Sequence, residues 1–156
     1  SLMKPIQKLK VNIDDGGRAA AGYKGETNDC ACRAIAIATG MPYQKVYDEL
    51  TARTKSWRIN SNSKFAYYAK PSTDTARTSM PKIVAKEYLK ELGWTWIPTM
   101  FIGLGCKVHL RKDELPAGRL LVHVSKHITA VIDGVLHDAY DCSREGTRCV
   151  YGYWKK

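Results

Sequence analysis

The run CACRAIAIAT at residues 30–39 constrains the fold more than any other part of the chain, because Arg33 is its only charged residue. Asp29 directly before it is a favourable N-cap residue, and Gly40 directly after it is a favourable C-terminal cap. The run is therefore predicted to be a helix. A helix that is small or apolar on nearly every side has to be enclosed by the rest of the protein.

The chain is long enough to enclose such a helix within one domain. Its 156 residues are 44% hydrophobic and 10% aromatic, which excludes wholesale disorder. No apolar run approaches the roughly 18 residues of a membrane-spanning helix, and no secretory signal follows Met3. We expect residues 3–156 to form a single domain in the cytoplasm with no membrane partner, and we interpret Ser1 and Leu2 as an expression scar.

The remaining pattern predicts helices first and strands later. Pro42 and Pro81 open two further helices, over 42–50 and 81–92. The C-terminal third alternates strand-like segments with turns, and this order is typical of an α+β fold in which N-terminal helices pack on a C-terminal antiparallel β-sheet. The predicted strands lie at 94–97, 119–124, 127–132, 135–140 and 149–154.

Residues 54–79 are rich in Ser, Thr, Asn and Lys and are predicted to be a long basic loop. Residues 51–90 carry nine cations and two anions, which is +7 of the formal charge of +10. Interleaved aromatic residues, among them Trp57 and Tyr67, can stack on bases, so one interpretation is a nucleic-acid-binding surface. The other is a solvated surface that attracts an acidic partner.

The five cysteines do not indicate a disulfide framework, because their number is odd and the chain has no signal peptide. One residue separates Cys30 from Cys32 and six separate Cys142 from Cys149, whereas structural zinc sites use spacings of two to four. We therefore expect no metal and no cofactor. A reactive thiol and small buried side chains remain as interpretations of these residues.

Cys30 stands at the start of the predicted helix. Unpaired N–H groups and the helix dipole stabilise a thiolate at that position and lower the pKa of the thiol. Cys32 lies roughly 200° further round the helix axis, so the two thiols face different partners. Cys30 is therefore the better candidate nucleophile, and Cys32 is expected to pack in the core.

The Asp133-Gly134 turn places a histidine and a carboxylate on one face of a hairpin. A two-residue turn fixes the register, and His127 and Asp138 then become diagonal neighbours about 7 Å apart at Cα. His137 falls on the opposite face. A histidine oriented by a carboxylate is the second half of a nucleophile–base–orienter triad. The structural alternative is a small buried Cys30 beside ordinary strand residues.

The segment NDCACRA at 28–34, together with HITAV at 127–131 and Asp138, resembles papain-like cysteine peptidases. It is similar to compact bacterial and phage members, including leader peptidases with an Asp-Cys pair at the start of the central helix. The resemblance implies an α+β fold with Cys30 as nucleophile, His127 as general base and acid, and Asp138 as the orienting residue.

The oxyanion site departs from that family pattern. Such peptidases usually carry a Gln about six residues before the nucleophile, where this chain has Lys24. Asn28 is the nearest amide, and with the backbone N–H of Cys30 it is our candidate for stabilising the oxyanion. Lys24, Trp57 and Tyr67 are our candidates for binding substrate.

We therefore expect a thiol-dependent hydrolase that cleaves a peptide, isopeptide or related amide bond of a peptide or protein substrate. An acidic substrate is one candidate. One alternative is an acyl transferase or transamidase that uses the same triad. The other is a basic nucleic-acid-binding or host-interaction protein in which the triad is structural or inactive.

Overall fold

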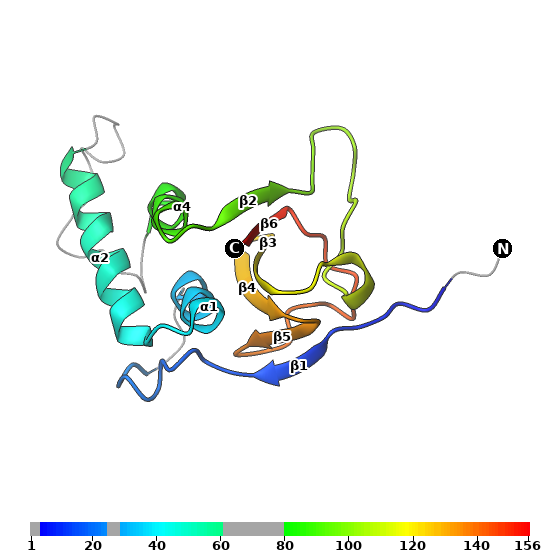
Figure 1. Cartoon of the computed structure of the whole chain (residues 1–156), viewed down its shortest axis with the longest axis horizontal. Helices are drawn as coiled ribbons and strands as arrows, with labels where there is room; N and C mark the ends of the chain where they lie inside the picture. Colours follow the sequence, from blue (N-terminus) through cyan, green and yellow to red (C-terminus); the bar gives the residue numbers. More distant parts are fainter. Residues whose placement is uncertain (1–3, 25–28, 61–79) are drawn as a thin grey trace.

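The structure is a computed structural model of the chain, and it describes residues 4–24, 29–60 and 80–156. Within these residues, three α-helices gather on one side of a curved sheet (Figure 1). The helices come first along the chain and most of the strands come last, so the predicted α+β class is confirmed. The helices are α1 (Cys30–Thr39), α2 (Tyr43–Asn60) and α4 (Lys82–Glu91), and a short 3-10 helix spans Lys112–Glu114.

The sheet has six strands in the order β1-β5-β4-β3-β6-β2. Every neighbouring pair is antiparallel except β1 with β5, which is parallel. The strands are β1 (Lys10–Ile13), β2 (Thr95–Pro98), β3 (Arg119–Val124), β4 (His127–Ile132), β5 (Val135–Asp138) and β6 (Gly152–Lys155).

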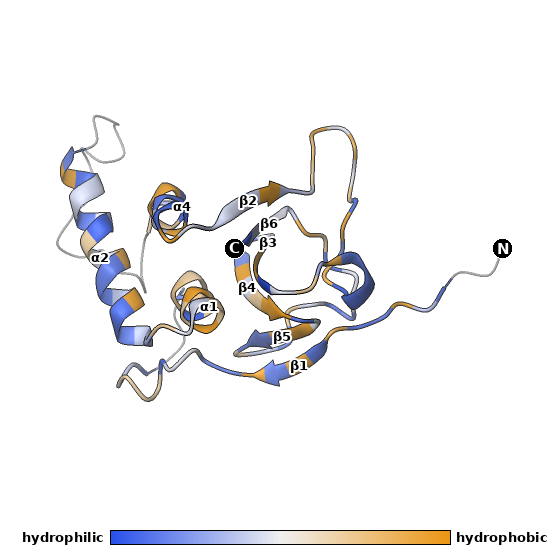
Figure 2. Ribbon diagram, in the orientation of Figure 1, coloured by the Kyte–Doolittle hydropathy of each residue, from blue (hydrophilic) through white to orange (hydrophobic). Residues whose placement is uncertain are grey.

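Helix α1 occupies the predicted 30–39 and packs against the centre of the sheet. Its apolar residues fill the space between the helices and one sheet face, where Ile35 and Leu121 are fully buried (Figure 2). Gly40 ends the helix in the left-handed conformation at φ 75°, and its N–H donates to the carbonyl of Ala36. A second core covers the other sheet face and includes Leu120, Val122, Val131, Leu136 and Val150.

Helix α2 continues to Asn60, so the prediction of irregular chain from residue 54 is wrong for 54–60. Leu50, Thr54 and Arg58 are buried at four-residue spacing, which is helical spacing. The hydroxyl of Thr54 donates to the carbonyl of Leu50 at 2.8 Å, so this buried polar group is satisfied inside the helix. The rest of the predicted loop, 61–79, lies outside the described residues.

The bounds of three predicted strands needed correction, and one strand was not predicted. β2 is Thr95–Pro98 rather than 94–97. The last strand is Gly152–Lys155 rather than 149–154, and β5 ends at Asp138 rather than at residue 140. Gly152 lies against the ring of Trp96, and a Cβ there would come within 2.4 Å of two ring carbons. β1 was not predicted, because all four of its residues are exposed and the strand is recruited only through its backbone pairing with β5.

His123, on β3, is a partly buried histidine whose surroundings favour the neutral ring. The indole N–H of Trp154 donates to its Nε2 at 3.0 Å, and the ring of Trp96 packs edge-on against it. Burial, with a smaller contribution from the charge of Lys82, lowers the pKa of His123 to about 4. This side chain therefore belongs to the core.

Cys106 and Cys149 form a disulfide, which corrects the expectation that the cysteines would be unpaired. An isolated backbone β-bridge between Met100 and Cys106 closes a short loop. A second β-bridge, between His109 and Cys149, brings Cys149 beside Cys106. The two Cα atoms lie 5.9 Å apart although 43 positions separate the residues. Disulfides persist mainly in oxidising compartments, so the cytoplasmic location stays a prediction.

Replacing both members of this disulfide with serine is expected to lower the free energy of unfolding by about 3–4 kcal/mol, because the bond restricts a loop of intermediate length in the unfolded chain. Urea unfolding of the oxidised protein and of the Cys106→Ser/Cys149→Ser variant measures the difference. Adding a reductant to the variant is the control and should change nothing. Equal stability of the two oxidised proteins would contradict the prediction.

Candidate active site

The fold brings the start of α1 to the start of β4, and so joins two residues that are almost a hundred positions apart in the chain. Cys30 is the first residue of α1 and is partly buried, and His127 is the first residue of β4. The thiol of Cys30 and the imidazole of His127 lie close enough for each to shift the pKa of the other. The fold therefore brings these two side chains into one neighbourhood.

Asp138 completes the group from the end of β5. Its Oδ2 lies 2.7 Å from Nε2 of His127, and both side chains are buried, at 7% exposure for the histidine and 4% for the aspartate. The hairpin register pairs Ile132 with Val135 and Ala130 with His137, as the turn predicted. With Nε2 engaged, Nδ1 is the ring nitrogen left for the thiol of Cys30.

The surroundings of Cys30 favour its thiolate. Burial raises the pKa of the thiol, but the hydrogen bond to His127, a backbone hydrogen bond with Ile128 and the charges of His127 and Arg33 outweigh burial and lower this pKa below its ordinary value. The Asp29 side chain makes no capping hydrogen bond to the helix start. The N–H groups at the start of α1 are therefore not capped by this carboxylate.

The surroundings of His127 favour the imidazolium. Burial lowers its pKa, but hydrogen bonds to Asp138, Cys142 and Cys30 more than compensate and raise the pKa to about 12. Burial also raises the pKa of Asp138, and the hydrogen bond from His127 reverses this and lowers it. The three groups are therefore electrostatically coupled, and the coupling favours the ion pair of thiolate and imidazolium.

Cys142 contacts this group of side chains, although no sequence pattern predicted it. Its buried thiol donates to Oδ2 of Asp138 at 3.6 Å. His127, Asp138 and Cys142 thus offer three ligand atoms within 4.8 Å of one another. Two ligands of a tetrahedral ion at about 2.1 Å lie ~3.4 Å apart, whereas the histidine and carboxylate atoms are in direct 2.7 Å contact. This arrangement is a hydrogen-bond network and would have to open to admit a metal.

A second ionic group lies directly behind the thiol. Arg33 is only 6% exposed and its guanidinium contacts both Asp29 and Asp138, the latter at 3.5 Å. Asp29 is fully buried. Its carboxylate also accepts a hydrogen bond from the hydroxyl of Tyr43 at 2.8 Å and forms an ion pair with Arg18 at 3.5 Å. The signal in the sequence was Arg33 itself, because a lone charge in a buried helix requires a partner.

Tyr140 lies beside the imidazole on its open side. The two ring centroids are 5.3 Å apart, and Tyr140 is 50% exposed. The sequence placed this residue in a strand and gave it no role. This exposed aromatic ring provides an apolar surface next to His127.

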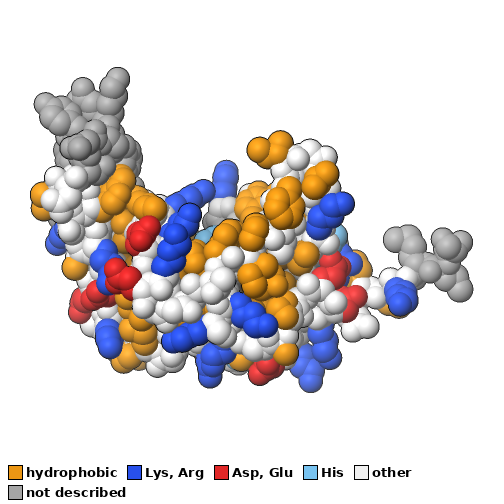
Figure 3. All heavy atoms as spheres, turned by 45° about the horizontal axis from the view of Figure 1, so that its top comes forward, with side chains coloured by type: hydrophobic (Ala, Val, Ile, Leu, Met, Phe, Trp, Pro, Cys, Tyr) orange, Lys and Arg blue, Asp and Glu red, His pale blue; other side chains and the backbone are white. Residues whose placement is uncertain are grey.

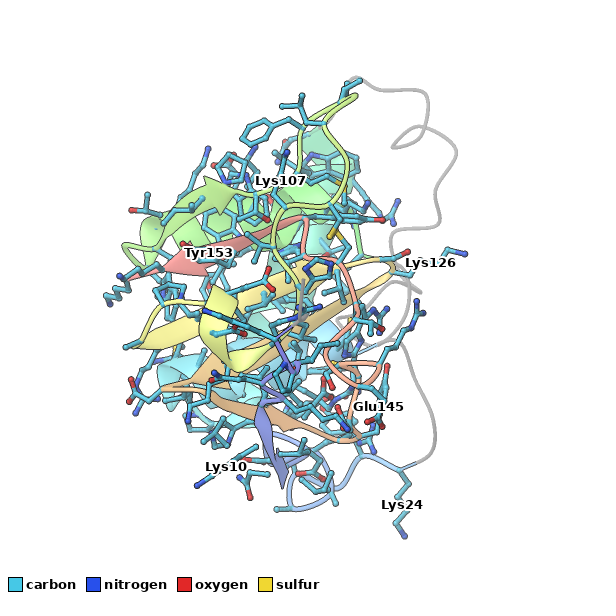
Figure 4. The ribbon with its side chains drawn as sticks, turned by 90° about the vertical axis from the view of Figure 1, so that its right-hand side faces the viewer. Lys10, Lys24, Lys107, Lys126, Glu145 and Tyr153 are labelled. Carbon is cyan, nitrogen blue, oxygen red and sulfur yellow. A yellow bond between two sulfur atoms is a disulfide. The ribbon has the colours of Figure 1, made fainter. Side chains whose placement is uncertain are left out.

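The other predicted site residues are not gathered around the thiol by the described structure. Asn28 and Tyr67 lie outside the described residues. Lys24 is exposed, and its side chain extends away from the ribbon (Figure 4). Trp57 packs partly buried against the core and lines a hollow on α2 with Arg53, Ser56 and Asn60, to which no member of the triad contributes. Substrate binding by Lys24 and Trp57 stays a prediction.

The surface also carries an apolar patch on the loop that follows β2. Phe101, Ile102 and Leu104 are exposed there, and orange side chains gather at this end of the molecule in Figure 3. A hollow of about 500 Å³ adjoins them, and Met100 and Tyr151 contribute to its wall. None of the triad residues lines this hollow. Within the described residues, no helix has both the length and the apolar character needed to cross a bilayer.

Cys30, His127 and Asp138 therefore form the candidate active site, with Arg33, Asp29 and Cys142 packed around them. Comparison of the chain with protein-family models, with curated proteins and with solved structures found no match.

Proposed function

We propose that this protein is a thiol-dependent hydrolase of papain-like type, which cleaves a peptide, isopeptide or related amide bond through Cys30, His127 and Asp138. The observation that carries the proposal is the buried 2.7 Å pair of His127 and Asp138, next to a helix-start thiol that lies close enough for the imidazole to lower its pKa. A nucleophile, a base within hydrogen-bond reach and a group that orients the base are the parts that acyl chemistry requires.

In the proposed reaction the thiolate of Cys30 adds to the carbonyl carbon, and the carbonyl oxygen takes up the negative charge. The imidazolium of His127 then gives its proton to the leaving amine as the carbon–nitrogen bond breaks, which leaves a thioester on Cys30. Water then attacks the thioester and gives a proton to His127, and the carbon–sulfur bond breaks, which releases the carboxylic acid and regenerates the thiolate of Cys30. Asp138 holds the ring in position and stabilises its charged form throughout.

An acidic substrate fits the positive charge of the chain. Lys126 directly precedes His127 and is exposed, and its side chain projects into solvent (Figure 4). The chain as a whole carries a formal charge of +10. A surface of this sign attracts and orients negatively charged peptides at low ionic strength.

The experiment uses an activated ester and an acidic protein, p-nitrophenyl acetate and fluorescein-labelled casein. The wild-type protein is expected to release a burst of about one mole of p-nitrophenolate per mole of protein. It should also gain an acetyl group on Cys30 and cleave the casein. Cys30→Ala should do none of these, while Cys32→Ala, two residues along the same helix, should keep all three. Acetylation and cleavage at the level of Cys30→Ala would contradict the proposal, and transfer of the acyl group to an added amine would favour the transferase alternative.

A further inference from the structure

Arg33 is a buried cation that links the helix carrying the nucleophile to the strand carrying the carboxylate. Its Nη1 pairs with Oδ1 of Asp29, and its Nη2 lies 3.5 Å from Oδ1 of Asp138. The guanidinium is a planar fork that can hold two carboxylates in a fixed relation. The contact therefore sets how α1 and β5 meet at the site.

The first consequence concerns Asp29. An aspartate at an N-cap ordinarily accepts from the N–H groups of the first turn and places its charge there. Here the carboxylate is instead occupied by Arg33 and by the hydroxyl of Tyr43, and it makes no capping hydrogen bond. The charge that would repel an adjacent thiolate is thereby neutralised, and the helix terminus is left to stabilise Cys30.

The second consequence concerns Asp138. Its Oδ1 accepts hydrogen bonds from Arg33 and from the backbone N–H of Ala139, while its Oδ2 faces His127. With one oxygen held on the side of the helix, the carboxylate cannot rotate without breaking a buried contact. The acceptor for the imidazole is thus fixed in direction.

The third consequence is the balance of charge in the buried cluster. Two carboxylates and a thiolate are matched by two guanidinium groups and an imidazolium. If one guanidinium is removed, the cluster has an excess negative charge, and the thiolate is the anion that takes up a proton most readily at neutral pH. The members are Asp29, Asp138, Cys30, Arg18, Arg33 and His127.

We propose that Arg33 is the positioning residue of this site, which holds Asp29 away from the start of α1 and Asp138 toward His127, and so keeps Cys30 in its nucleophilic form. The inference rests on the proposed function, because it assigns a role within the same triad. It concerns ionisation of the thiol and not contact with substrate.

The test follows alkylation of Cys30 by iodoacetamide against pH, with the modified residue identified by mass spectrometry. Arg33→Met is expected to move the inflection of the rate profile up by about one pH unit, which makes alkylation at pH 6 about tenfold slower. Arg33→Lys keeps the positive charge and should return the inflection most of the way to the wild-type position. Thermal unfolding is measured on the same samples.

A double variant separates this role from a merely structural one. Asp29→Asn combined with Arg33→Met removes both partners of the buried ion pair, so it should recover most of the thermal stability that Arg33→Met loses. Its alkylation profile should return only part of the way, because the charge balance is restored while Asp138 still lacks the guanidinium that holds it toward His127. Full recovery of the profile together with the stability, or an unshifted profile in Arg33→Met, would overturn the inference.

Failure of the proposed function gives a different result in the same experiment. If the wild-type inflection lies near the value of about 8.5 of an ordinary cysteine, only about 3% of Cys30 is thiolate at pH 7 and the triad proposal itself fails. A low wild-type inflection that Arg33→Met leaves in place keeps the triad and rejects only the role of Arg33.

Discussion

Alkylation of Cys30 at pH 7 is expected to slow by about two orders of magnitude when His127 is replaced with alanine. The imidazole supplies both the hydrogen bond and the nearest positive charge that lower the pKa of the thiol. Without them only the backbone hydrogen bond with Ile128 and the charge of Arg33 oppose burial, so the pKa of the thiol rises toward its ordinary 9.0, where about 1% of the thiol is ionised at pH 7. The rate of iodoacetamide modification, measured residue by residue, gives the result.

His137 provides a matched control for that change. It lies on the adjacent strand, pairs with Ala130, and contacts Asn12 at 3.0 Å rather than the thiol. His137→Ala should therefore leave the alkylation rate of Cys30 unchanged. Equal rates in wild type and His127→Ala would show that the imidazole does not ionise the thiol.

The second large effect is expected from Asp138→Ala, which should lower turnover by about 10³–10⁴-fold and the free energy of unfolding by about 3–5 kcal/mol. The carboxylate accepts hydrogen bonds from His127, the Ala139 N–H, Cys142 and Arg33. Its removal leaves a buried guanidinium and imidazole without their shared acceptor. Urea unfolding measures the stability, and p-nitrophenyl acetate turnover measures the activity.

The pH dependence of stability gives this prediction its sign. The pKa of Asp138 is lowered in the folded protein, so its contribution is fully present above the unfolded value of 3.8 and is lost as the pH falls through the lower folded value. The pKa of His127 is raised to about 12, so its contribution is full below 6.5 and declines as the pH rises toward 12. Asp138→Ala should therefore flatten the acid limb of the stability profile, and an unchanged acid limb would contradict the coupling.

Local sequence patterns predicted two parts of the site correctly. The 30–39 helix follows from caps and composition that lie within or beside it, and the 127–138 hairpin follows from one two-residue turn. Each pattern involves neighbours in the chain, so its geometry is set by backbone physics alone. The shared face of His127 and Asp138 follows from strand periodicity and register.

Patterns failed where the deciding contact was distant or involved only the backbone. β1 has four exposed residues, and only the free edge of β5 makes it a strand. The end of α2 looked irregular because Thr54 and Arg58 are polar, yet both are buried. The disulfide between Cys106 and Cys149 depends on a loop that doubles back, which no cysteine spacing encodes.

The sequence by itself determined the parts: a buried helix that begins with a thiol, and a hairpin that carries a histidine and a carboxylate on one face. Tertiary structure alone decided how those parts meet, because α1 packs against β4 at a position set by side chains from the whole core. The same packing decided that Arg33 contacts two carboxylates and that Cys142 joins the triad. A charged residue in a buried segment indicates, from sequence alone, that it has a partner of opposite charge. Only the tertiary structure determines which residue that partner is.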